Sequence, residues 1–136
     1  YKFEAGTPDV PGLLGLEAAI KFLQNLGMEN IRKAEESLFN YATSKLKSIN
    51  GLQIIGQAEH KASVISFLLQ GIHPFDAGTI LDQLGVAVRT GNHCAQPIME
   101  KFGITGTIRA SLAIYNSPEE IDRLAEAIVK TQTMLL

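Results

Sequence analysis

The stretch RTGNHCAQP, residues 89–97, contains the only cysteine of the chain, Cys94. A cysteine thiolate is a strong nucleophile, and a nearby positive charge or helix N-terminus favours it over the neutral thiol. Gly91, Asn92 and His93 come just before Cys94, and glycine and asparagine are turn formers. A helix that begins at the following proline would bring its N-terminus close to the sulfur. The stretch therefore predicts a loop that presents a reactive cysteine.

The same residues also allow a purely structural role for Cys94. A free cysteine is usually a small, buried side chain. In that case Cys94 packs under the short helix that follows, and His93 is a solvated loop residue. The loop alone leaves both possibilities open.

A second candidate is Arg109, in the stretch TIRASLAIY. Side chains alternate between the two faces of a strand, so Thr107, Arg109 and Ser111 share one face. One interpretation of this polar face is an exposed surface of a sheet. The other is a guanidinium that binds a substrate carboxylate through two parallel hydrogen bonds, while Arg89 adds positive charge beside the cysteine. A carboxylate close to a thiolate indicates an amino acid or a similar small acid.

Gly6 and Thr7 come just before the first helical segment. Their backbone N–H groups and hydroxyl suit an anion such as a phosphate. A turn followed by a helix cap explains the same residues, and on the residues alone we favour it. His60 and His73 have no Cys, Asp or Glu partner at metal-ligand spacing, so we predict no metal site.

The elements that would position these residues follow from the period of the apolar side chains. Apolar residues recur at helical spacing in the first two long segments and again at Phe75, Ile80 and Leu84, while Ser117 and Glu120 form the pattern of a capping box. The pattern predicts helices over 11–27, 28–49, 73–85, 97–103 and 117–136, and strands over 52–56, 63–70, 86–90 and 107–115.

This order of elements predicts an α/β domain of the two-layer α+β type. We expect a small sheet of about four strands with helices packed on it. The mostly apolar strand 63–70 is expected to lie in a central, well-covered position.

Composition narrows the classes of function. The 136 residues suit one domain, and they carry 12 Lys and Arg against 14 Asp and Glu. Without a basic cluster, we expect neither nucleic-acid nor membrane binding, and no segment has the pattern of a signal peptide or a membrane span. A single cysteine makes no internal disulfide, which favours a cytoplasmic location. Because the chain opens at Tyr1 rather than Met, we expect a piece of a longer polypeptide.

Three separated motifs together resemble one family over nearly the whole chain: FEAGTPDVPGLLGLEAAI, AVRTGNHCAQPIM and TIRASLAIYNSPEEIDRL. They resemble the C-terminal part of the SufS-type cysteine desulfurases, also described as selenocysteine lyases, which are fold-type I enzymes that use pyridoxal phosphate. The NifS and IscS-type branch resembles the loop motif only distantly. The resemblance implies the small domain of such an enzyme over residues 29–136. Residues 1–28 would be the segment and helix that lead from the large cofactor domain.

The resemblance implies a role for each candidate residue. Cys94 matches the nucleophile that takes the sulfur of cysteine as a persulfide and leaves alanine, in the pathway of iron–sulfur cluster assembly. Arg109 matches the arginine that binds the substrate carboxylate, and Arg89 matches an arginine that helps to position loop and substrate. Gly6 and Thr7 match a segment that contacts the cofactor phosphate of the other subunit in a homodimer.

The resemblance also implies supporting roles for Gly91, Asn92 and His93 in the loop, and it names the molecules that act with it. The substrate would be L-cysteine or L-selenocysteine, and the sulfur acceptor a SufE- or SufU-like protein. The lysine that binds pyridoxal phosphate lies in the family's large domain and has no counterpart among residues 1–136. The fragment alone is therefore expected to be inactive and to lack the cofactor.

Two other functions remain possible from the residues. One is a stand-alone α/β module that binds small acids and uses Cys94 as a redox sensor. The other is a different fold-type I enzyme, such as a transaminase, in which the RTGNHC loop has no evident purpose.

Overall fold

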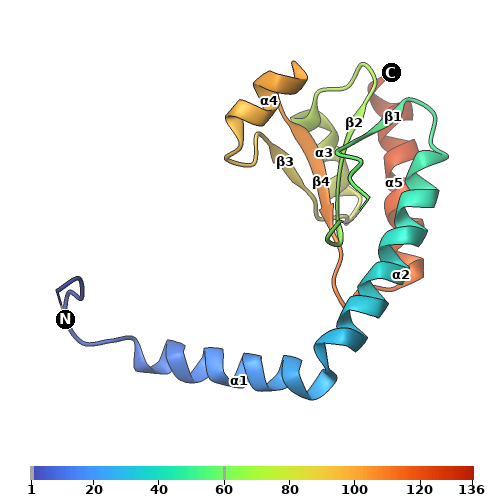
Figure 1. Cartoon of the computed structure of the whole chain (residues 1–136). Helices are drawn as coiled ribbons and strands as arrows, with labels where there is room; N and C mark the ends of the chain where they lie inside the picture. Colours follow the sequence, from blue (N-terminus) through green and yellow to red (C-terminus); the bar gives the residue numbers. More distant parts are fainter. Residues whose placement is uncertain (1, 60) are drawn as a thin grey trace. The chain divides into compact units, whose positions relative to one another are not determined.

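A computed structural model describes residues 2–59 and 61–136 of the chain. Its elements follow one another in the predicted order (Figure 1). They are α1 (Val10–Leu26), α2 (Met28–Lys47), β1 (Leu52–Ile55), β2 (Val64–Leu69), α3 (Pro74–Gln83), β3 (Arg89–Gly91), α4 (Gln96–Phe102), β4 (Thr107–Ser111) and α5 (Pro118–Leu135).

The chain divides into two compact units, Tyr1–Lys33 and Ala34–Leu136. The first unit contains α1, which begins after Asp9, whose carboxylate accepts a hydrogen bond from the backbone N–H of Gly12 at 3.0 Å. None of the residues of α1 is buried. Its large apolar side chains are exposed, namely those of Val10, Leu13, Leu14, Leu16, Ile20, Phe22, Leu23 and Leu26.

The second unit is built on a four-stranded antiparallel sheet with strand order β1-β2-β4-β3. Strand β4 is the last to appear in the sequence, yet it lies between β2 and β3. The prediction of a two-layer domain with about four strands is therefore confirmed, as is the interior position of β2.

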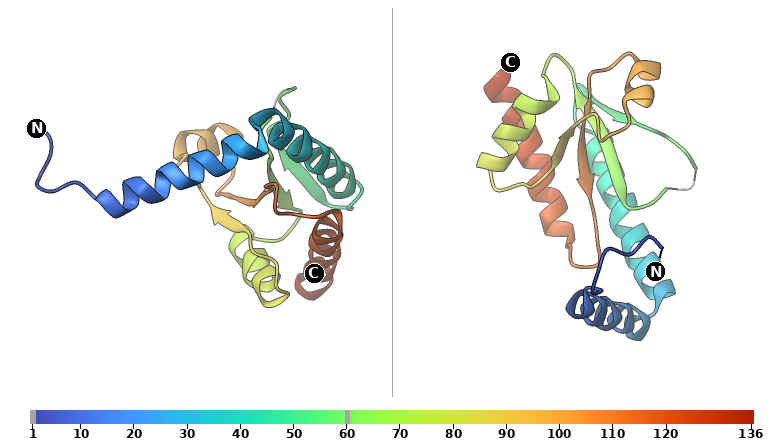
Figure 2. Two further views of the ribbon diagram at one scale, coloured as in Figure 1. Left: turned by 90° about the horizontal axis from the view of Figure 1, so that it is seen from below. Right: turned by 90° about the vertical axis from the view of Figure 1, so that its left-hand side faces the viewer.

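One face of the sheet carries the core of this unit. Successive strand residues point to opposite faces, and the buried series Ile65, Phe67 and Leu69 of β2 lies on the face shared with Ile108 of β4. Buried side chains of α2, α3 and α5 complete the cluster. Figure 2 shows α3 and α5 side by side, where they cover this face.

Several local expectations need correction. Phe75 is not part of the buried face of α3, since 67% of its surface is exposed; Pro74, Ala77 and Leu81 form that face instead. Strand β3 begins at Arg89 rather than at residue 86, and β4 ends at Ser111. The shortening follows from pairing, because only residues that face a partner strand enter the sheet.

The start of α5 agrees with its predicted capping box. The backbone N–H of Ser117 donates to a carboxylate oxygen of Glu120 at 3.1 Å. None of the helices in the described part of the chain is long and apolar enough to cross a bilayer.

Candidate active site

Two arginines meet on the sheet face opposite the core. Arg89 of β3 pairs directly with Arg109 of β4, and Ser66 of β2 pairs with Arg109 on its other side. Directly opposed residues of antiparallel strands project from the same face. Arg109 is partly buried and Arg89 is exposed. The strand pairing therefore places two positively charged side chains on the same face of the sheet, an arrangement that favours binding of an anionic group.

The loop between β3 and α4 holds Cys94 in an unusual conformation. His93 and Cys94 both have positive φ angles, 55° and 57°, a region that residues other than glycine adopt only at a cost. The side-chain carbonyl of Asn92 stabilises this turn, because it accepts the backbone N–H of Cys94 at 3.1 Å. Ala95 closes the turn with a backbone bond to Asn92 at 2.9 Å.

The thiol of Cys94 is exposed, so the structural alternative of a cysteine packed under α4 is wrong. Its Sγ lies 4.0 Å from a terminal guanidinium nitrogen of Arg89. In this contact the guanidinium is the donor, so the sulfur is held beside a permanent positive charge. Helix α4 begins at Gln96, one residue before its predicted start, and Ala95 at its N-cap offers no side-chain oxygen.

His93 points from the loop toward β4. Its Nε2 lies 2.9 Å from the hydroxyl oxygen and 3.2 Å from the carbonyl oxygen of Thr107. Partial burial, followed by the positive charge of Arg109, lowers the pKa of His93 below its ordinary value of 6.5, and the bond to Thr107 opposes this only in part. The imidazole is thus neutral at pH 7, and it ties the cysteine loop to the strand that carries Arg109.

Two glycines bring the start of the loop against the start of β4. A Cβ added at Gly106 would lie 2.8 Å from the carbonyl carbon and oxygen of Gly91. Gly91 has a φ of 112°, which L side chains rarely adopt. The close approach requires the missing side chain of Gly106. At Gly91 a Cβ would meet nothing within 4 Å, so glycine is favoured there by its positive φ. The approach brings His93 within reach of Thr107.

The sequence did not identify Gly106 or Thr107 as parts of the site. Thr107 was noted only as a polar residue beside Arg109, and it is 1% exposed. A buried threonine directly after a glycine, on a strand that carries an arginine, is the one local sign that was available. The partnership with His93 depends on strand pairing and has no signature in either segment.

Gly6 and Thr7 belong to the first unit, and both are exposed. Thr7 is not the cap of α1, because Asp9 has that role. Gly6 has a φ of 126°, and a Cβ added there would meet nothing within 4 Å, so its backbone is open to a ligand.

His73 has a structural role at the start of α3. His73 caps α3 by accepting the backbone N–H of Phe75 at 3.3 Å, and His60 lies outside the described residues. Within residues 2–59 and 61–136, no cluster of three or more His, Cys, Asp or Glu side chains is arranged to hold a metal ion.

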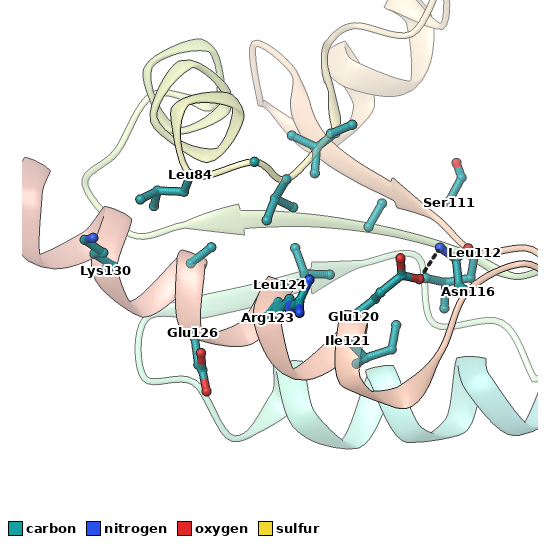
Figure 3. A pocket seen from close by; sticks show the side chains of 16 residues that line it. Leu84, Ser111, Leu112, Asn116, Glu120, Ile121, Arg123, Leu124, Glu126 and Lys130 are labelled. Carbon is teal, nitrogen blue, oxygen red and sulfur yellow. Dashed lines mark hydrogen bonds between the residues drawn. The ribbon is translucent and has the colours of Figure 1, made fainter.

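A groove of about 650 Å³ lies away from this loop, between the segment before β3, the end of β4 and α5 (Figure 3). Its lining includes Leu84, Leu124 and Lys130, and a hydrogen bond from Asn116 to Glu120 at 3.0 Å crosses one end. None of the predicted site residues lines it.

Comparison with known proteins connects this site to a family. Residues 1–124 match the family model described as aminotransferase class-V. The chain belongs to the class-V aminotransferase family. Its fold is that of the family's small domain, because it superposes with a TM-score of 0.91 and 35% identity on the cysteine desulfurase CsdA (S-sulfonic acid) from Escherichia coli. That superposition covers 99% of this chain and 33% of CsdA.

Curated relatives of this class-V chain are also described as cysteine desulfurases. It is 44% identical over 135 residues to a probable cysteine desulfurase from Xylella fastidiosa. The aligned region covers 99% of this chain and 32% of the relative. It is 47% identical over 132 residues to a cysteine desulfurase from Synechococcus elongatus, which covers 97% of the chain and 21% of that protein. The chain therefore spans a third or less of the length of these relatives. The predicted resemblance to the cysteine desulfurases is confirmed at the level of the family, and the SufS type stays a prediction.

Proposed function

We propose that this chain is the C-terminal part of a pyridoxal-phosphate-dependent cysteine desulfurase of the SufS type, in which Cys94 receives the sulfur. The arrangement of Cys94 carries the proposal. An exposed thiol is held on a short turn beside Arg89, and a second arginine, Arg109, lies on the paired strand. A nucleophile and a carboxylate-binding cation at one site fit an amino acid that carries sulfur.

In the proposed reaction Arg109 binds the carboxylate of L-cysteine or L-selenocysteine and aims the substrate sulfur or selenium at Cys94. The thiolate of Cys94 forms a bond to that atom while its bond to the substrate carbon breaks. The electron pair of the broken bond stays with the carbon, which takes up a proton and leaves as alanine. Cys94 is left as a persulfide when sulfur is taken, or with the corresponding sulfur–selenium bond when selenium is taken, and Gly91, Asn92 and His93 keep its loop in place.

The groups around Cys94 suit the substrate rather than the cofactor. They are a thiol, two guanidinium groups and a neutral imidazole, which bind a carboxylate and accept sulfur. When bound in the whole enzyme, pyridoxal phosphate would supply an electron sink. The open backbone of Gly6 and the hydroxyl of Thr7 fit its phosphate group, and we propose that they contact the cofactor of the other subunit in a homodimer.

We propose that the lysine for the cofactor lies outside this chain, so that the chain alone is inactive. Three lysines of this chain already have other contacts or face solvent. Lys21 pairs with Glu17, Lys61 donates to the carbonyl of Gly56 at 2.8 Å, and Lys101 is exposed on α4.

The persulfide needs an acceptor. The exposure of Cys94 supports transfer of sulfur to a SufE- or SufU-like protein for iron–sulfur cluster assembly in the cytoplasm. A net charge of −2 does not favour binding to the phosphate backbone of a nucleic acid.

The full-length protein that carries this chain tests the proposal. Cys94→Ala should abolish the formation of alanine and persulfide from cysteine, because no thiolate remains to take the sulfur, while the visible absorbance of the cofactor is kept. Alanine is measured by chromatography, and the persulfide by the mass of the intact protein. Undiminished turnover of cysteine by Cys94→Ala would contradict the assignment of the nucleophile. An amino-group transfer in its place would indicate a transaminase.

A further inference from the structure

Two buried polar atoms of the site have no hydrogen-bond partner. In the described part of the chain, the buried and unpaired side-chain atoms are Nδ1 of His93, Nε of Arg109 and Oγ1 of Thr43. Leaving such atoms unpaired is costly, and most buried polar groups in proteins find a partner. Two of these three atoms belong to the same small site.

The contacts of His93 decide which ring nitrogen carries the proton. The carbonyl oxygen of Thr107 only accepts hydrogen bonds, and it lies 3.2 Å from Nε2. An unprotonated Nε2 would direct its lone pair at that oxygen. Nε2 therefore donates to Thr107, and in the neutral ring Nδ1 is left as an acceptor.

The second unpaired atom is its chemical complement. Nε of Arg109 carries one hydrogen and only donates. Arg109 and Thr107 lie on the same face of β4, so the guanidinium and the ring emerge from neighbouring positions. After burial, the positive charge of Arg109 is the next largest cause that lowers the pKa of His93, which agrees with these neighbouring positions.

We propose that His93 is a positioning residue whose Nδ1 is connected to the Nε–H of Arg109 through one bridging water molecule, which links the substrate-binding guanidinium to the cysteine loop. Thr107, His93 and Arg109 then form one chain of hydrogen bonds. Movement of the Cys94 loop and rotation of Arg109 become coupled.

This link determines how Arg109 binds its ligand, an inference that rests on the proposed function. Arginine binds a carboxylate either through its two terminal nitrogens or through Nε and one terminal nitrogen. With Nε engaged by His93, only the terminal pair remains free. Arg109 therefore binds the substrate carboxylate end-on, along the axis of its side chain.

Nitrogen NMR of the 136-residue chain with ¹⁵N-labelled histidine tests the link without any activity. His93 should be in the Nε2–H tautomer. Arg109→Lys keeps the positive charge but lacks an Nε donor, so it should shift the Nδ1 resonance toward the value of a free acceptor. The matched control, Arg89→Lys, should leave the resonance in place. An Nδ1–H tautomer, or equal responses to the two arginine variants in folded protein, would overturn the proposal.

Two variants of the full-length protein extend the test to binding. His93→Gln retains a donor near Nε2 but removes the acceptor at Nδ1, so KM for cysteine should rise by about two- to tenfold, the effect of one hydrogen bond, with kcat kept. His93→Asn retains an acceptor near Nδ1 and should recover much of that loss. Equal KM values for the wild type and His93→Gln would contradict the coupling. If the protein does not act on cysteine, the proposed function fails, and the NMR result still decides the link.

Discussion

At Cys94 the reactive group and the strained backbone coincide. The positive φ angles of His93 and Cys94 cost conformational energy, and three contacts offset that cost. Asn92 binds the backbone of Cys94, His93 binds Thr107, and Arg89 lies beside the sulfur. The thiol is therefore held in a defined direction while it remains open to solvent.

The contact of Arg89 with the sulfur predicts the reactivity of Cys94. Arg89→Gln should change the rate of alkylation of Cys94 by iodoacetamide by about two- to fivefold, the effect of one hydrogen bond, because it removes the guanidinium contact at 4.0 Å that holds the sulfur in one direction. Mass spectrometry against time measures the rate. Arg123→Gln on α5 is the control and should react at the wild-type rate. An unchanged rate in Arg89→Gln would show that Arg89 does not influence the reactivity of the thiol.

The lowered pKa of His93 predicts how stability depends on pH. In the unfolded chain His93 regains its ordinary pKa, so between the two values the unfolded state binds more protons. The contribution of His93 to stability is thus complete above its unfolded pKa of 6.5 and is lost as the pH falls toward the lower folded value.

Urea unfolding at about pH 7.5 and about pH 5.5 measures this difference. The free energy of unfolding should drop more for the wild type than for His93→Gln, which cannot be protonated in this range. A larger drop in the variant would mean that the sign is wrong.

At the scale of elements, the close contact of Gly91 with Gly106 sets the distance between β3 and β4 at the cysteine loop. Strand β3 has only three residues and lies at the edge of the sheet, so it has few other pairs to hold it. The contact therefore governs the strand and the loop together.

Gly106→Ala tests this dependence. The added methyl group would collide with rigid backbone at Gly91, so we expect a loss of about 1–3 kcal/mol in the free energy of unfolding and a changed alkylation rate at Cys94. Gly15→Ala, in α1, is the control, since a Cβ there meets nothing within 4 Å and alanine favours helix. It should leave the unfolding of the second unit as it is. A Gly106→Ala protein as stable as the wild type would show that β3 and β4 can move apart at this point without a loss of stability.

The elements and the site differ in how far they were predictable. Local period and caps were sufficient for the existence and order of the helices and strands, because propensity and amphipathic pattern act over a few neighbouring residues. They were not sufficient for the start of β3 and the end of β4, which depend on strand pairing. Phe75 was misjudged because helical spacing describes a face without stating which face is covered. The pairing of β4 between β2 and β3, and with it the contact of His93 with Thr107, depends on residues far apart in the chain.

At the scale of the whole molecule, the apolar side chains of α1 are the largest departure from a self-sufficient domain. The helix has no buried residue, and Leu16 and Ile20 are 56% and 45% exposed. Apolar patches of this kind on soluble proteins are usually covered by another surface.

We expect the 136-residue chain to associate with itself at high concentration through α1. Sedimentation velocity should show an average mass that rises with concentration. Leu16→Glu with Ile20→Glu should abolish the rise, because the apolar area is lost. Gln24→Glu with Asn25→Glu adds the same charge at polar positions of α1 and should still associate. Association that persists in the first pair of substitutions would place the contact elsewhere.

The position of β4 in the sheet has a consequence during synthesis of the protein on the ribosome. Chains are synthesised from the N-terminus, so the cysteine loop leaves the ribosome before Gly106 and Thr107, which hold it. Until β4 inserts between β2 and β3, the loop that carries the thiol follows β3, a strand that has no partner yet. The step that completes the sheet is therefore also the step that fixes the direction of the Cys94 thiol, the proposed nucleophile, and a nascent chain stalled before Gly106 would carry Cys94 without this fixed geometry.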